Sequence, residues 1–189
     1  MTNFYVCLCA HNGNEFISNQ IDSILNQSYN SVHIFAFDFS SSDGTDDIIK
    51  EYSENHSNVS FVKFDYAPGA KESFYIGLDY VNSRVHNGWI LLSDQDDVWC
   101  SNKLDRLNDL IGLYGDNIEL MYHDVNLIDE RGELLAHSYY GLVGRDPIKE
   151  SVLSQLVLSN VAIGHTMCFS KEFLSEILSL SVRDCFLMH

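Results

Sequence analysis

The feature that most constrains the fold is the regular alternation of short apolar segments with helical segments in the first half of the chain. Four apolar runs have the length and composition of strands, at residues 4–10, 32–37, 59–64 and 89–92. Helical patterns lie between them at residues 15–27, 46–52 and 71–85, with Thr45 a candidate N-cap of the second helix. This alternation predicts a parallel, doubly wound sheet, which binds ligands beyond the carboxyl ends of its strands.

The fourth apolar run ends in a cluster of carboxylates, Asp94-Gln95-Asp96-Asp97. Carboxylate oxygens suit Mg²⁺ or Mn²⁺, and these cations usually keep their remaining positions for water and substrate phosphates. The cluster therefore predicts a metal site that serves a phosphate-bearing substrate. The alternative is an acidic turn that simply stays in water, and the cluster alone does not decide between the two.

The second half of the chain predicts a mixed sheet and no separate second domain. Helical patterns occur at residues 103–114, 151–158 and 171–178, and strand patterns at 119–125 and 161–169. The segment from Asp129 to Gly132 resembles a hairpin turn. No internal repeat or linker divides the 189 residues, whose 46% hydrophobic content is enough for one substantial core.

Charge and composition exclude some classes of function. Eleven basic against twenty-seven acidic residues give a net charge of −16, which repels nucleic acid. Residues 4–10 lack the basic flank of a signal peptide, and no segment reaches the roughly 20 apolar residues that span a bilayer, so we expect a cytoplasmic protein. The five cysteines agree with a reducing compartment. Cys7 and Cys9 share one strand face and are expected to be small buried hydrophobes rather than metal ligands.

Five motifs in sequence order resemble one known family. Residues 10–13 resemble its Thr-Tyr-Asn-Gly loop, and residues 21–29 its first helix. Residues 38–45 resemble the family's sequence Asp-Asp-Gly-Ser-x-Asp-Gly-Thr. Residues 93–99 resemble its metal motif, and Asn102-Lys103-Leu104 follow downstream as in the family. Residues 160–169 resemble its pattern Asn-x-x-x-Gly-x-Thr-Met-x-Phe. Over nearly the whole chain, the sequence is similar to a family 2 nucleotide-sugar glycosyltransferase of the rhamnosyltransferase-like subgroup.

The resemblance implies a GT-A fold, a Rossmann-like three-layer α/β/α arrangement with a mostly parallel sheet and a mixed second half. Residues 1–100 would form the nucleotide-binding half, and residues 101–189 an incomplete acceptor-binding half. The implied reaction is metal-dependent, inverting transfer of a sugar from a nucleoside diphosphate to a saccharide or lipid-linked saccharide in polysaccharide or lipopolysaccharide assembly. Analogy alone adds a peripheral contact with the inner face of the membrane. The sequence leaves open the nucleotide, the sugar, the acceptor and the oligomeric state.

The resemblance also implies roles for single residues. Asp96, with Asp94 alongside, would hold a divalent Mg or Mn cation. The donor would be bound by residues of the strand-end loops and of one helix start: His11, Asn12, Gly13, Asp38, Lys71, Asp94 and Asp97. Each has a plainer interpretation that stays open, in which Asp38 caps a turn, His11 is an exposed loop residue and Lys71 is solvated.

Four further residues are weaker candidates, each with a structural alternative. Asp124 would touch the acceptor or make a structural pairing within the chain. His165 would face the donor sugar or be buried and hydrogen-bonded. His123 closes a predicted strand beside Asp124. Trp99 would form a wall of the sugar site or pack in the core.

The chain departs from the family pattern at two places. Phe39 replaces the second Asp after the second strand, which usually reads the nucleotide base, and would either stack on the base or pack within the loop. In the subgroup an Asp-Trp-Trp sequence follows the Met-His pair, and its Asp is the general base. This chain ends at Met188-His189, so the base is expected beyond His189 and the 189-residue form is expected to have little or no activity. The alternative function is a non-catalytic nucleotide-sugar-binding or interaction module.

Overall fold

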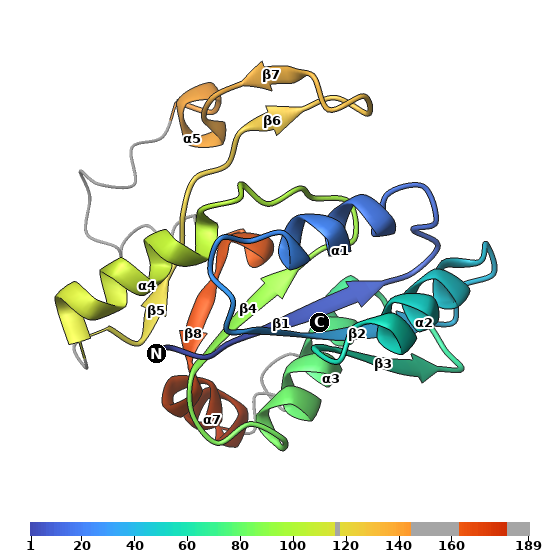
Figure 1. Cartoon of the computed structure of the whole chain (residues 1–189), viewed down its shortest axis with the longest axis horizontal. Coiled ribbons are helices and arrows are strands. Elements are labelled where there is room, and N and C mark those ends of the chain that lie inside the picture. The colour runs from blue at the N-terminus through green and yellow to red at the C-terminus, as the bar shows by residue number, and fades with distance from the viewer. Residues whose placement is uncertain (116–117, 145–162, 181–189) are drawn as a thin grey trace.

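The computed structural model describes residues 1–115, 118–144 and 163–180, and its centre is a six-stranded sheet (Figure 1). The strand order is β3-β2-β1-β4-β8-β5. The strands are β1 (Phe4–Ala10), β2 (Val32–Phe39), β3 (Val59–Phe64), β4 (Trp89–Ser93), β5 (Leu120–Met121) and β8 (Cys168–Ser170). The first four pair in parallel, whereas β8 is antiparallel to both of its neighbours. The predicted parallel sheet with a mixed second half is therefore confirmed.

Helices cover both faces of this sheet, which gives three layers (Figure 1). Helices α1 (Ile17–Leu25), α2 (Thr45–Asn55) and α4 (Lys103–Tyr114) contribute buried side chains to the core on one face. Helices α3 (Ala70–Asn82) and α7 (Lys171–Ser179) contribute to the core on the other face. Helix α2 begins at Thr45, which the sequence suggested as its N-cap. In the structure the N-cap position is occupied by Gly44, one residue earlier.

The period-2 pattern of β1 divides its side chains between the two cores. Val6 and Leu8 lie in the core beneath α1, and Cys7 and Cys9 lie in the core beneath α3. Cys7 is fully buried and Cys9 nearly so, which confirms the expected role of both thiols as small hydrophobes. Their small size matters, because a Cβ added at Gly77 of α3 would lie 2.7 Å from the Cys7 sulfur.

The second half adds a hairpin arm beyond the sheet, made of β6 (Leu127–Ile128), β7 (Leu134–Ala136) and the short helix α5 (Tyr139–Leu142) (Figure 1). The predicted turn is present, since Asp129 N donates to Glu133 O at 2.9 Å and Gly132 has φ of 80°. The strand predicted at 119–125 is only two residues long. The helix predicted at 151–158 lies outside the described residues.

The predicted strand at 161–169 is largely replaced by other structure in its described part. Residues 164–166 form the 3-10 helix η2 (Gly164–Thr166), and β8 follows it. The turn of η2 brings His165 to the end of β4. Among the described residues, none of the helices has both the length and the apolar character needed to cross a membrane.

Candidate functional site

The loops that follow β1 and β4 are joined at the carboxyl edge of the sheet. His11 N donates to Gln95 Oε1 at 2.8 Å, and Gln95 Nε2 donates to His11 O at 3.2 Å. A Cβ at Gly13 would lie 2.4 Å from Gln95 Oε1, so the absence of a side chain at Gly13 makes this contact possible. The two loops therefore form one surface, as the parallel topology predicted for His11 and the Asp94 cluster.

The loop after β2 is tied to the same surface. Asn12, in the left-handed region with φ of 51°, donates from its backbone N to Ser41 Oγ and accepts from Ser42 N, both at 2.9 Å. Gly13 N donates to Thr45 Oγ1 at 2.8 Å. Polar backbone groups are thus paired between loops, so the edge is held in a defined shape before any ligand binds.

Asp94, Asp97 and His165 form a compact group at the end of β4. His165 Nδ1 lies 3.1 Å from Asp94 Oδ2 and 3.6 Å from Asp97 Oδ2, and one ligand atom of each residue lies within 4.8 Å of the others. The hydrogen bond with Asp94 raises the pKa of His165, and the charge of Asp97 adds to this effect while burial opposes it. Burial raises the pKa of Asp97, as do the nearby charges of Asp94 and Asp96.

This group fits a divalent cation. Asp97 Oδ2 is buried and makes no hydrogen bond within the described part of the chain, which is costly for a carboxylate oxygen unless a ligand completes it. Carboxylates suit Mg²⁺ or Mn²⁺, the cations expected from the sequence, and the imidazole nitrogen of His165 offers a third ligand atom. Asp96, which the resemblance named as a metal ligand, is exposed and lies outside this group.

Asp38 provides a second buried carboxylate at the same edge. The residue is fully buried, and its Oδ2 accepts a hydrogen bond from Ser41 N at 3.2 Å, as a turn-capping side chain does. Its Oδ1 is buried and has no hydrogen-bond partner among the residues that the structure describes. Asp38 therefore combines a turn-capping role with one oxygen that is left for a hydrogen-bond donor.

Phe39 packs within the protein. Its side chain is 1% exposed and stacks on Phe64, with ring centroids 4.7 Å apart and planes 4° from parallel. The alternation of β2 places it with Phe37 in the core on the α3 side. Of the two roles left open by the sequence, the structure shows packing, and the ring offers no exposed face to a base.

Lys103 and Trp99 lie near the group formed by Asp94, Asp97 and His165. Trp99 is buried, and the Lys103 ammonium lies over its ring, 3.7 Å from the centroid. Burial lowers the pKa of Lys103 to about 8, although the charge of Asp97 acts in the opposite direction. The sequence showed Lys103 only as part of a motif, and no local pattern indicated that its ammonium would be buried beside the site. Lys71, by contrast, is exposed near the start of α3.

Asp124 has a structural role. Its Oδ1 accepts hydrogen bonds from the backbone N of Val125 at 2.8 Å, Tyr139 at 3.0 Å and Tyr140 at 3.2 Å, and Ser138 Oγ donates to its Oδ2. These bonds fix the base of the hairpin arm and lower the pKa of Asp124 against the effect of partial burial. The structural pairing of Asp124, rather than contact with an acceptor, is what the structure shows.

His123 lies beside the site on the β5 side. Its Nδ1 is 2.7 Å from the carbonyl oxygen of Asp124, and its Nε2 is buried with no partner in the described residues. Burial lowers the pKa of His123 to about 4, and the charge of Lys103 contributes to the decrease.

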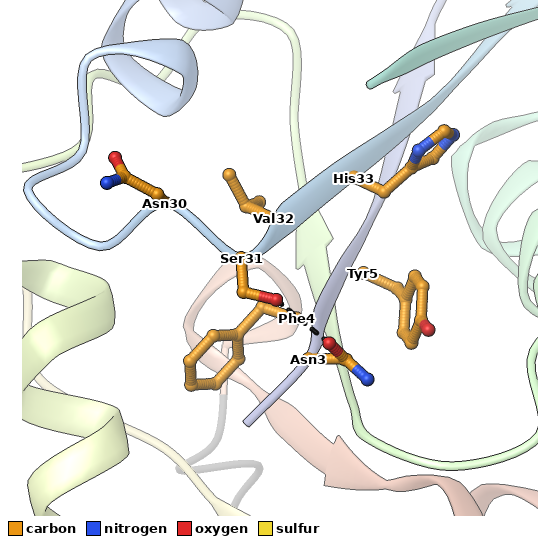
Figure 2. Close-up of a pocket in the computed structure, with 7 residues that line it drawn as sticks. All are labelled: Asn3, Phe4, Tyr5, Asn30, Ser31, Val32 and His33. Atoms are coloured by element: carbon orange, nitrogen blue, oxygen red, sulfur yellow. Dashed lines mark hydrogen bonds between the residues drawn. The ribbon is translucent and has the colours of Figure 1, made fainter. Parts of the chain in front are cut away.

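A surface hollow of about 300 Å³ lies at the opposite edge of the sheet, where β1 and β2 begin (Figure 2). Figure 2 shows Ser31 turned toward Asn3, and Ser31 Oγ donates to Asn3 Oδ1 at 2.8 Å. His33 Nε2 lies 2.8 Å from Ser60 Oγ. These polar groups satisfy one another, so the hollow has less need of a ligand than the carboxyl edge.

Known structures share this fold. The structure of S. aureus TarS 1-349 in complex with UDP-GlcNAc has a TM-score of 0.70 at 16% identity, and the match covers 93% of this chain and 47% of that one. The mannosyltransferase PcManGT from Pyrobaculum calidifontis, in complex with GDP-Man and Mn²⁺, has a TM-score of 0.63 at 17% identity, with 93% and 46% covered. At these identities the likeness establishes the GT-A fold and no more.

Curated relatives are more similar in sequence. The UDP-Glc:alpha-D-GlcNAc-diphosphoundecaprenol beta-1,3-glucosyltransferase WfgD of Escherichia coli is 26% identical over 159 residues, which are 84% of this chain and 56% of WfgD. The dTDP-rhamnosyl transferase RfbG of Shigella flexneri is 27% identical over 145 residues, 70% of this chain and 49% of RfbG. The chain spans about half the length of these relatives. Its residues 5–178 match the profile of Glycosyl transferase family 2, and the chain belongs to that family.

Proposed function

We propose that this chain carries the donor site of a glycosyltransferase, which moves a sugar with inversion from a nucleoside diphosphate to a hydroxyl of a saccharide. Family membership and the relatives named for glucosyl and rhamnosyl transfer support this reaction. The relatives also support a place in the assembly of a surface polysaccharide or lipopolysaccharide.

The observation that carries the proposal is the pair of unsatisfied carboxylate oxygens at the carboxyl edge, Asp38 Oδ1 after β2 and Asp97 Oδ2 after β4. Strand β1 lies between β2 and β4, so one ligand that crosses the end of β1 can reach both. An ionised Asp38 carboxylate can accept hydrogen bonds but cannot donate them. It therefore suits the N–H groups of a base or the hydroxyls of a ribose. Asp97 belongs to the cation group. A nucleoside diphosphate with its cation matches this arrangement.

The chain's residues have distinct tasks in this proposal. Asp94, Asp97 and His165 would hold a divalent cation, which neutralises the negative charge that develops on a diphosphate leaving group. The pairing of His11 with Gln95 keeps the β1 and β4 loops at a fixed separation, so the donor meets a preformed edge. Because several carboxylates line this edge, an anionic diphosphate would be repelled without a cation. Donor binding should therefore depend on the metal.

The proposed acceptor is a hydroxyl of a saccharide. None of the residues that the structure describes is assigned the role of general base. The acceptor named for WfgD carries a diphosphoundecaprenol lipid. A lipid-linked saccharide as acceptor, with peripheral contact at the cytoplasmic face of a membrane, fits the same reaction.

Calorimetric titration tests the donor site. UDP, GDP and dTDP are each titrated into the chain with and without MnCl₂. We expect at least one nucleotide to bind in the presence of Mn²⁺ and to bind much more weakly without it. Asp97→Asn should weaken this binding at least about 10-fold, because loss of a group that holds or orients a metal typically costs that much. Asp109→Asn, at an exposed position of α4, is the matched control and should leave it unchanged. Failure of all three nucleotides to bind with Mn²⁺ would overturn the proposal.

A further inference from the structure

Within the described part of the chain, His123 Nε2 is a third buried side-chain atom without a hydrogen-bond partner, and its position follows from the order of the strands. His123 is the second residue after the end of β5, the outermost strand, which pairs with β8. The turn η2 leads into β8 and carries His165. Along the carboxyl edge the polar groups therefore run from Asp38 through Asp94 and Asp97 to His165, and His123 lies beyond them.

The tautomer of His123 is fixed by its hydrogen bond. The atom 2.7 Å from Nδ1 is a carbonyl oxygen, which can only accept, so Nδ1 carries the proton and donates. In a neutral imidazole the other nitrogen is then a bare acceptor. The ring is neutral near pH 7, because burial and the charge of Lys103 lower the pKa of His123 to about 4. Nε2 is thus a buried acceptor that lacks a donor.

A hydroxyl is the ligand group that this nitrogen fits. Phosphate and carboxylate oxygens have no proton to donate, and their lone pairs would repel that of Nε2. A cation is disfavoured, since His123 is not among the three residues whose ligand atoms lie together. A group with a pKa of about 4 is also too weak a base to deprotonate a sugar hydroxyl at neutral pH.

The hydroxyl belongs to the transferred sugar if the donor lies as proposed above. A nucleoside at Asp38 and a diphosphate at the β4 group place the next part of the donor, the sugar, on the β8 and β5 side. We propose that His123 is a sugar-binding residue of the donor site, whose Nε2 accepts a hydrogen bond from a hydroxyl of the transferred sugar. This role rests on the proposed function, because it takes the direction of the donor from it.

The test separates the sugar from the nucleotide. The affinities of UDP-glucose, UDP-N-acetylglucosamine, GDP-mannose and dTDP-rhamnose, each with Mn²⁺, are compared with that of the matching nucleoside diphosphate. His123→Leu removes the acceptor at similar volume and should weaken the bound nucleotide sugar by about 3- to 10-fold, the effect of one neutral hydrogen bond. Its affinity for the nucleoside diphosphate should change by less than about twofold. His123→Gln, which can place an amide oxygen near the position of Nε2, should recover part of the loss.

His33→Leu is the matched control, because His33 is also partly buried but lies at the opposite edge of the sheet. It should leave both affinities unchanged. Deoxy analogues of the bound donor give an independent measurement with the unaltered chain. One of them should bind about 3- to 10-fold more weakly than the parent sugar. That difference should disappear in His123→Leu, which has no acceptor, and should be smaller but still present in His123→Gln, so either variant that folds gives the test.

Two outcomes are distinguishable. If no nucleoside diphosphate binds, the proposed function fails and the role of His123 fails with it. If nucleoside diphosphates bind as proposed, but the His123 variants keep the affinity of the unaltered chain for the nucleotide sugar, only the role of His123 is overturned. Nε2 would then be paired with water alone.

Discussion

Replacing His123 by glutamine should flatten the acid side of the stability profile of this protein. His123 is held as a neutral ring by burial, by the charge of Lys103 and by that of His165, all of which lower its pKa. Glutamine keeps a side chain that can donate to the carbonyl oxygen of Asp124 but has no proton to gain. The variant therefore removes one titration from the folded state and leaves the others in place.

The sign and size of this change in stability follow from the linkage between proton binding and folding. The pKa of His123 is lowered from 6.5 to about 4 on folding, so below pH 6.5 the unfolded chain takes up a proton that the folded chain does not. Stability is then lost as the pH falls from 6.5 toward 4. The titration of His123 leaves the free energy of unfolding almost unchanged at pH 7.5. It lowers that free energy by about 2 kcal/mol at pH 5 and by about 3 kcal/mol at pH 4.

Urea unfolding at pH 7.5, 6, 5 and 4 measures the effect. At pH 7.5 the variant should be within about 1.5 kcal/mol of the unaltered chain, the range of one hydrogen bond. Between pH 7.5 and 5 the difference should move by about 2 kcal/mol in favour of the variant. Since all other titrations are shared, a constant difference across this range would refute the neutral, buried state assigned to His123.

Two further predictions concern the ends of β1 and β2. Gly13→Ala should cost about 1–3 kcal/mol and weaken nucleotide binding, because the end of the Gln95 side chain must move and give up its two hydrogen bonds with His11. Gly112→Ala, with open space on α4, should be neutral or stabilising, and equal shifts in Tm would contradict this. Phe39→Asp, which restores the carboxylate of the family, should cost more than about 3 kcal/mol in urea unfolding because it buries a charge in the aromatic contact with Phe64; a stable variant with improved nucleotide affinity would be the opposite result.

The first half of the fold could be predicted because its signals are local. Each of the four parallel strands is a short apolar run between polar loops, and the handedness and direction rules for such sheets bring the following loops to one edge. The hairpin turn from Asp129 to Gly132 was predictable for the same reason, since its residues alone favour a turn. The two-residue length of β5 was not, because only tertiary pairing decides how much of an apolar segment joins a sheet.

The composition of the acidic group depended on contacts that the sequence does not reveal. Within a strand, Asp94 and Asp96 would share one face. Strand β4, however, ends at Ser93, and Gln95 and Asp96 form a turn. The turn returns the chain so that Asp97 rather than Asp96 lies with Asp94. His165 joins them from 71 residues away, through the short turn before β8.

We propose above that the carboxyl edge of the sheet binds a nucleoside diphosphate through a cation held at the end of β4. Crystals of the chain grown with Mn²⁺ and the nucleotide that binds best in calorimetry would show this by anomalous scattering at the manganese edge. We expect one strong peak between Asp94, Asp97 and His165, with diphosphate density beside it and the nucleoside next to Asp38. Manganese held elsewhere, or nucleotide density away from this edge, would contradict it.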